Sequence, residues 1–116
     1  MWRVIPVLLA TACTSATQER IERTILLTVE NRSGAQLWYF QYSGCGIDDW
    51  FEVIASDEYV PDGADVSSVD LDPGCYELYV EDEYGCWSEN DTDGNVKGGF
   101  EFTWTVRASD MTCPLY

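Results

Sequence analysis

The sequence contains no histidine and few basic residues: Lys and Arg number 6 against 21 Asp and Glu, and the formal net charge is −15. Without histidine, the chain lacks the side chain that most often serves as a general base or a metal ligand. Nucleic acid and anionic lipid surfaces repel so acidic a chain, so we expect no nucleic-acid partner. Cations, basic proteins and neutral ligands remain as candidate partners. The alternative explanation of the acidity is that it only keeps the protein soluble.

Long hydrophobic runs and helical spacing are also missing. The apolar run at residues 4–10 is far too short to span a bilayer, and no stretch keeps a helical period over three turns. There is no low-complexity tract, and aromatic residues make up 14% of the chain. This composition excludes a disordered chain and fits one small packed domain.

The N-terminal residues have the layout of an export signal. Arg3 precedes the short apolar run, and small residues lead to Cys13. The segment Leu9-Ala10-Thr11-Ala12-Cys13 resembles the lipobox of bacterial lipoproteins, with Ala10 where leucine is usual. We predict a lipoprotein-type signal peptide at residues 1–12, lipidation of Cys13 and a tether at residues 13–24. An ordinary cleaved signal with an incidental Cys13 is the alternative.

The address of such a lipoprotein depends on the residue after the cysteine. Thr14 is not the aspartate that retains Gram-negative lipoproteins at the inner membrane. The pattern therefore predicts an exported protein, attached by its lipid to the bacterial outer membrane or cell surface.

The remaining cysteines form an even set that suits two disulfides: Cys45, Cys75, Cys86 and Cys113. If successive strands run alternately up and down, Cys45 and Cys75 lie at one end of the domain, and Cys86 and Cys113 lie at the other. A bridge needs Cα atoms within roughly 7 Å of each other. We therefore predict the pairs Cys45–Cys75 and Cys86–Cys113.

From Ile25 onward, apolar residues recur with a period of two between turn residues, as in short strands. We expect strands near residues 25–30, 36–43, 50–54, 66–71, 75–80 and 100–107, with Val69 and Leu71 inward in the fourth. Residues 88–99 are rich in Asp, Asn and Gly and are expected to form a loop. The fold class is all-β: a small antiparallel β-sandwich of immunoglobulin-like dimensions at residues 25–116.

The aromatic residues divide into a core set and a binding set. A two-sheet core is expected to take Trp38, Phe40, Phe100, Phe102 and Trp104. Aromatic residues in or beside loops are candidates for stacking on a glycan or a partner protein, and the ligand-binding candidates are Trp50, Tyr84 and Trp87.

Acidic loop residues offer a second candidate site. Ca²⁺ prefers six to eight oxygen ligands, and Glu89-x-Asp91-x-Asp93-Gly94 is similar to the start of a calcium loop, without the final glutamate. The candidate metal ligands are Asp48, Asp49, Glu89, Asp91, Asp93 and Asn95, and plain turns are the alternative. Asp48 and Asp49 are neighbouring loop carboxylates in a small domain with no evident cleft, which is weak support for acid–base catalysis, so no catalytic residue is assigned. Ca²⁺ is the one candidate cofactor.

Several short segments, taken in order, resemble a family of uncharacterised bacterial lipoproteins and exported proteins. They are residues 29–34, 37–39, 45–50, 71–76 with Leu78, and 102–106. The resemblance implies a small β-sandwich and no known activity. Together these features predict a lipid-anchored extracytoplasmic binding or structural module that is not an enzyme. Its expected partner is an unknown protein or glycan. A calcium-dependent or carbohydrate-binding β-sandwich is the alternative.

Overall fold

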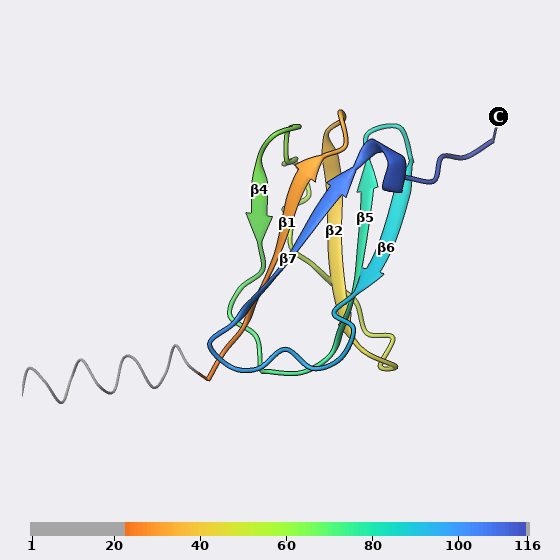
Figure 1. The fold of residues 1–116 in the computed structure, drawn as a ribbon. Coiled ribbons are helices and arrows are strands. Elements are labelled where there is room, and N and C mark those ends of the chain that lie inside the picture. The colour runs from red at the N-terminus through yellow and green to blue at the C-terminus, as the bar shows by residue number, and fades with distance from the viewer. Residues whose placement is uncertain (1–22, 116) are drawn as a thin grey trace, which may run out of the picture.

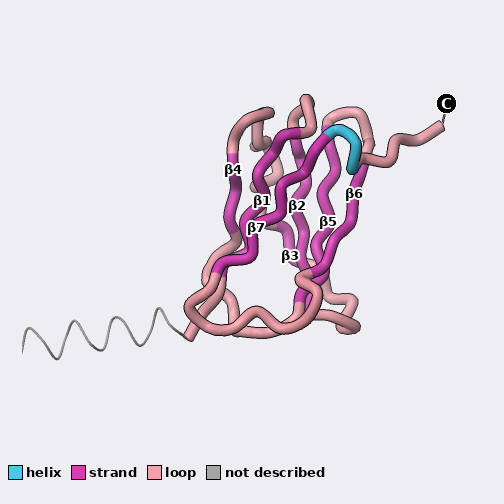
Figure 2. Tube along the Cα trace, viewed as in Figure 1, coloured by secondary structure: helices cyan, strands magenta, loops and turns pink. Residues whose placement is uncertain are grey.

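The computed structural model describes residues 23–115, which form seven strands in two sheets (Figures 1 and 2). The predicted signal peptide, Cys13 and nearly all of the tether lie outside the described residues. The strands are β1 (Leu26–Arg32), β2 (Leu37–Gly44), β3 (Phe51–Glu52), β4 (Asp65–Ser67), β5 (Tyr76–Asp82), β6 (Trp87–Asp91) and β7 (Glu101–Arg107), followed by a 3₁₀ turn η1 (Ala108–Asp110). The predicted small all-β sandwich is confirmed. Within residues 23–115, no helix has the length and apolar character needed to cross a membrane.

Both sheets contain neighbouring strands that are distant in the sequence. The first sheet has the order β4-β1-β7 and the second β3-β2-β5-β6. The arrows of β1, β5 and β7 point one way in Figure 1, and those of β4 and β6 point the other way. Because the first and last of the seven strands run in the same direction and are neighbours, β1 and β7 pair in parallel. This pair departs from the purely antiparallel arrangement that the sequence predicts, and every other strand pair is antiparallel.

The core lies between the sheets and is built from the alternating positions that the sequence indicates. Ile25, directly before β1, and Leu27 and Val29 within it are buried, as are Leu78 and Val80 along β5. The remaining buried apolar side chains of this cluster are Leu37, Phe40, Ile54, Val60, Trp104 and Val106. Apolar burial on this scale is the main favourable term for folding.

Both predicted disulfides are present, one at each end of the sandwich. Cys45 follows β2 and bonds Cys75 before β5, while Cys86 in the β5–β6 turn bonds Cys113 beyond η1. The Cα atoms are 5.4 Å and 4.1 Å apart in the two bridges. The alternation of strand direction that predicted these pairs is therefore confirmed as well.

A bulge at Trp38 changes which aromatic residues of β2 enter the core. Leu37 pairs with Asp82 and Tyr39 with Glu81, so Trp38 is an extra residue in the ladder. Leu37 and Phe40 are consequently both fully buried, three residues apart, and Trp38 is only partly buried.

Two further expectations about exposure are wrong. Val69 is 72% exposed, because β4 ends at Ser67 and the buried Ser68 takes the inward position. The Oγ of Ser68 accepts a hydrogen bond from the backbone N–H of Leu27 at 3.0 Å. Phe100 is 65% exposed, since it lies in the turn before β7 and not in the strand itself.

The segment after Trp87 is the remaining correction. Residues 88–91, expected in the loop at residues 88–99, belong instead to the edge strand β6, which pairs along its length with β5. Its only buried side chain is that of Ser88. A strand with no inward apolar residue gives no period-two hydrophobic signal, so the sequence pattern missed it.

Candidate functional site

The acidic candidates for a metal site are mostly engaged in turns. Asp48 Oδ1 accepts a hydrogen bond from Trp50 Nε1 at 2.9 Å. Asp91 Oδ1 accepts one from the backbone N–H of Asp93 at 2.8 Å. The φ angles of Asp48 and Asp93 are +57° and +51°, a left-handed conformation that Asp and Asn adopt more readily than most residues. These are the roles of ordinary loop residues.

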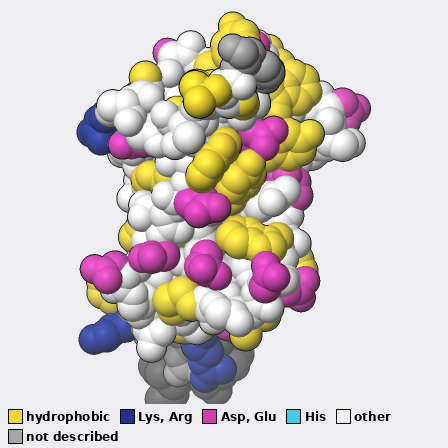
Figure 3. All heavy atoms as spheres, turned by 90° about the vertical axis from the view of Figure 1, so that its right-hand side faces the viewer, with side chains coloured by type: hydrophobic (Ala, Val, Ile, Leu, Met, Phe, Trp, Pro, Cys, Tyr) yellow, Lys and Arg dark blue, Asp and Glu magenta, His cyan; other side chains and the backbone are white. Residues whose placement is uncertain are grey.

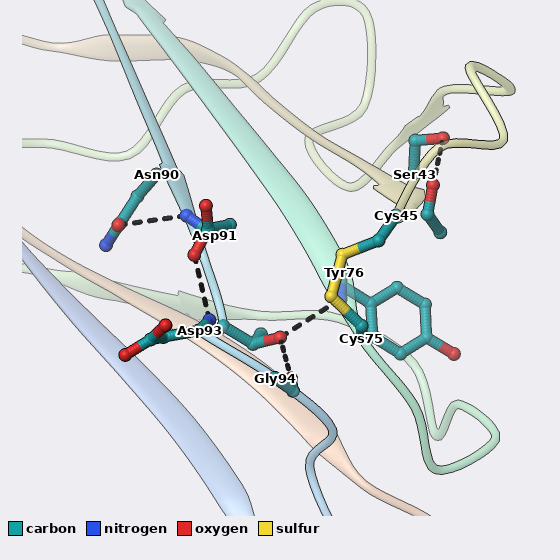
Figure 4. The surroundings of a disulfide bond; sticks show 10 residues. Ser43, Cys45, Cys75, Tyr76, Asn90, Asp91, Asp93 and Gly94 are labelled. Atoms are coloured by element: carbon teal, nitrogen blue, oxygen red, sulfur yellow. Dashed lines mark hydrogen bonds between the residues drawn. A yellow bond between two sulfur atoms is a disulfide. The ribbon is translucent and has the colours of Figure 1, made fainter.

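The structure does not bring the acidic candidates together. In Figure 4 the Cys45–Cys75 bond lies between Ser43, near the end of β2, and the segment of Asp91 and Asp93, where β6 ends. Ser43 Oγ accepts the backbone N–H of Asp49, so Asp49 belongs to the Ser43 side. Among residues 23–115, no three acidic or cysteine side chains are close enough to hold a metal ion. The calcium site predicted at Asp48, Asp49, Glu89, Asp91, Asp93 and Asn95 therefore has no geometric support.

The three aromatic candidates are exposed, but they do not form one site. Tyr84 is 67% exposed in the β5–β6 turn, beside the Cys86 end of the sandwich. Trp50 is 39% exposed in the loop that follows Cys45, at the other end. Trp87 is 37% exposed at the start of β6. Trp50 and Trp87 nevertheless border the same surface, the outward side of the second sheet.

This surface is here called the outer face. It consists of the residues of β2, β5 and β6 that point away from the core: Tyr39, Gln41, Glu77, Tyr79, Glu81, Trp87, Glu89 and Asp91. The strand register places them in rows, since Tyr39 pairs with Glu81 and Glu81 pairs with Trp87. No other described strand covers the outer face, because the second sheet packs its opposite side against the core.

Aromatic rings occupy the centre of the outer face. Tyr79 and Trp87 stack with ring centroids 6.5 Å apart and planes inclined by 18°. The phenol of Tyr79 donates a hydrogen bond to Glu81 Oε1 at 2.5 Å, which fixes the ring. Burial raises the pKa of this phenol, and the hydrogen bond to Glu81 and the charges of Glu81 and Glu89 raise it further.

Three hollows open on or beside the outer face, and each combines aromatic rings with carboxylates. The first, of about 340 Å³, lies between Trp50 and the carboxylates of Glu77, Glu89 and Asp91. The other two, of about 380 Å³ and about 350 Å³, share Trp38 and Tyr39 as walls. Their remaining walls include Glu52 in one, and Glu81, Asp82 and Glu83 in the other.

The charge of the domain is distributed unevenly between the sheets. The strands of the second sheet carry Glu52, Glu77, Glu81, Asp82, Glu89 and Asp91 and no basic residue. Those of the first sheet carry Glu30, Asp65 and Glu101 together with Arg32 and Arg107. Figure 3 views the β6 side of the molecule: acidic and hydrophobic side chains are interspersed there, and basic side chains lie at the margins.

Sequence reasoning identified two of the aromatic residues in or beside the outer face and missed two others. Trp50 and Trp87 were predicted from their loop positions, whereas Tyr39 and Tyr79 were not. The missing signal was present in β5, where Glu77, Tyr79 and Glu81 alternate with the buried Leu78 and Val80. Once the inward residues of a strand are known, the same alternation names the outward ones.

A comparison with known proteins finds no matching family model, no similar curated protein and no similar solved structure. The resemblance to small exported lipoproteins therefore stays a prediction, and the case for function rests on the geometry of the outer face.

Proposed function

We propose that the chain is a lipid-anchored extracytoplasmic binding module, without enzymatic activity, that holds its partner on the outer face of the second sheet. The observation that carries this proposal is the set of aromatic rings, Tyr39, Tyr79 and Trp87, presented outward on adjacent strands. Tyr39 is 45% exposed and Trp87 37% exposed. Exposed aromatic residues gathered on one surface are more typical of interaction sites than of the rest of a protein surface.

The two disulfides support an extracytoplasmic location for the module and a rigid binding surface. Disulfides persist in oxidising environments such as the periplasm and the cell surface. The Cys45–Cys75 bridge joins the end of β2 to the start of β5 within the second sheet, and the Cys86–Cys113 bridge joins the β5–β6 turn to the segment after η1. A surface built on stapled strands binds with little loss of conformational entropy.

The position at which the described chain begins is compatible with anchoring through Cys13. The described chain enters β1 at the end of the sandwich opposite the β5–β6 turn (Figure 1). A tether attached there leaves the outer face unobstructed by the membrane. The lipid on Cys13 is itself part of the proposal, because it rests on the sequence pattern alone.

Carbohydrate binding is the second candidate, and one observation favours it. The Trp50 ring lies beside Asn90 and Glu89 in the first hollow, which combines a stacking surface with hydrogen-bonding groups. Sugars are bound by such combinations of an aromatic ring and polar side chains.

The anchor is tested by fractionating cells that produce the full chain and measuring the mass of the mature N-terminus. We expect the protein in the membrane fraction with diacylglycerol on Cys13, and Cys13→Ser in the soluble fraction. An unmodified Cys13 in the membrane-associated protein contradicts the lipid anchor.

Binding through the outer face is tested by photo-crosslinking in the same cells. A photoreactive amino acid replaces Tyr39 in one variant and the exposed Thr103 of β7 in a control variant. We expect a crosslinked product at position 39 and none at position 103. The absence of a product at position 39, or equal products at both positions, contradicts a binding role for this face.

A further inference from the structure

We infer that the outer face docks a basic polypeptide segment whose lysine or arginine side chains enter the three hollows. This inference rests on the proposed binding function and adds the chemical class of the partner. Its basis is the complementarity of charge and shape between such a segment and the exposed sheet.

The first argument is the uncompensated charge of the face. The strands of the second sheet contain no lysine or arginine, so no basic group of this sheet neutralises the outer carboxylates. Arg32, a basic residue of the first sheet, has its Nη1 3.4 Å from Asp65 Oδ1. A cationic partner is therefore attracted to the second sheet more strongly than to the first.

The second argument is an unfavourable pair within the face. Glu77 and Asp91 stand directly opposite each other in the antiparallel β5–β6 pair, with Glu89 two residues along β6. Like charges directly opposite in an antiparallel pair are destabilising. A cation seated in the first hollow relieves this repulsion, because all three carboxylates line it.

The third argument is the composition of the hollows, which suits long organic cations. Each hollow joins an aromatic wall, Trp50 or Trp38 with Tyr39, to at least one carboxylate. The methylene stem of lysine or arginine packs on a ring while the charged head meets a carboxylate, and a cation over a ring is itself attracted. Three such hollows on one sheet match several basic side chains of one polypeptide better than a single small cation.

A bare metal ion and a neutral glycan fit the same features less well. No three acidic side chains among the described residues are close enough to coordinate a metal. A neutral glycan uses the rings but leaves the repulsion between Glu77 and Asp91 in place. The polypeptide accounts for the rings, the carboxylates and the like-charged pair together.

The test uses the full chain purified in detergent and a short fluorescent peptide of alternating lysine and glycine. Its control peptide has glutamine in place of each lysine. Fluorescence anisotropy measures binding at low salt and with added NaCl. We expect the lysine peptide to bind in a salt-sensitive manner and the glutamine peptide not to bind.

The matched variants separate the outer face from the net charge. Glu77→Gln/Glu89→Gln removes two charges from the first hollow, and Asp65→Asn/Asp70→Asn removes two charges in and after β4, on the other sheet. We expect the first variant to weaken binding by about tenfold and the second by less than about twofold. Circular dichroism melting confirms that both variants remain folded.

Several outcomes overturn the inference. Equal weakening of binding in the two variants means that the peptide responds only to the overall charge of the protein. Equal binding of the glutamine peptide means that the partner needs no positive charge. Binding of a neutral glucan oligosaccharide in place of the lysine peptide identifies a glycan site. If no peptide binds but position 39 still crosslinks in cells, the basic partner is excluded and the binding module stands. If position 39 also fails to crosslink, the proposed function fails with it.

Discussion

Tyr79 and Glu81, neighbours on the outward side of β5, share a hydrogen bond of 2.5 Å from the phenol to the carboxylate. The bond requires a protonated phenol, because the phenol is the donor. Since both residues lie in the centre of the outer face, the bond couples the conformation of this face to pH at the alkaline end.

Tyr79→Phe is expected to change the alkaline pH dependence of stability. Burial and the contact with Glu81 raise the pKa of the folded phenol above its ordinary value of about 10. Above that pH the unfolded chain releases the proton while the folded chain keeps it. The unfolded state then binds fewer protons, so the free energy of unfolding falls as pH rises.

Urea unfolding near pH 9 and near pH 11 measures this slope. We expect the fall to be shallower in Tyr79→Phe than in the native protein. Tyr84→Phe, which alters an exposed phenol at the β5–β6 turn, is the matched control. An equal change of slope in the control contradicts the assignment to Tyr79.

Strands whose two sides differ in polarity were predictable from the sequence, and the others were not. The alternation in β1 and β5 gave the correct inward residues, because one side of each strand is apolar and packs on the core. Directly after β4 the inward position is Ser68, held by a hydrogen bond that no hydrophobic pattern records. In β2 the bulge at Trp38 depends on pairing with β5, which lies far away in the sequence.

Some features of the candidate site were likewise predictable from the sequence, and others were not. The disulfide pairs followed from the direction of successive strands, and the exposure of Trp50, Tyr84 and Trp87 followed from their positions in or beside loops. The outer face needed the register of β2, β5 and β6, which brings Tyr39, Glu81 and Trp87 into one row. Strand order in a sandwich depends on contacts between distant segments, so no local pattern specifies it.

Asn31→Ala is expected to lower the free energy of unfolding by about 2–4 kcal/mol. The Asn31 side chain is fully buried, and its Nδ2 donates to the carbonyls of Ala35 and Val60 at 2.8 Å and 3.0 Å. Its Oδ1 accepts hydrogen bonds from the N–H and the hydroxyl of Ser33. Alanine leaves these buried partners unpaired. Urea unfolding measures the loss.

The control for Asn31 is Asn90→Ala, at an exposed position in β6. This variant is expected to change the free energy of unfolding by less than about 0.5 kcal/mol. A loss at Asn31 no larger than that at Asn90 means that the buried network does not stabilise the β1–β2 turn.

Ser68→Ala and Val69→Ser test the two adjacent residues after β4 whose orientations differ from the sequence prediction. Ser68→Ala leaves the Leu27 N–H without its acceptor in a buried setting, which costs roughly 1–3 kcal/mol. Val69→Ser removes an exposed apolar side chain and changes stability by less than about 0.5 kcal/mol. Thermal unfolding of both variants gives the comparison. The reverse order, with Val69→Ser the more damaging, contradicts the inward orientation of Ser68.

Removal of either disulfide is expected to destabilise the domain by a similar amount. The bridges close loops with sequence separations of 30 and 27 residues that do not overlap, Cys45–Cys75 and Cys86–Cys113. Loops of this size give roughly 3–4 kcal/mol each in the chain-entropy account. Cys45→Ala/Cys75→Ala and Cys86→Ala/Cys113→Ala are compared by urea unfolding, with the native protein as reference.

The two bridges differ in what their loss does locally. The Cys86–Cys113 bridge holds the C-terminal segment where Thr112 exchanges backbone hydrogen bonds of 2.7 Å and 2.8 Å with Trp87. Without it, we expect faster amide exchange at Trp87 and Thr112, because an unstapled chain end opens locally at lower cost. Loss of Cys45–Cys75 is expected to speed exchange of the amide at position 45, which in the native protein donates to the Cys75 carbonyl at 3.0 Å, and to leave exchange at Thr112 unchanged. Equal exchange patterns in the two variants contradict independent stapling of the two ends.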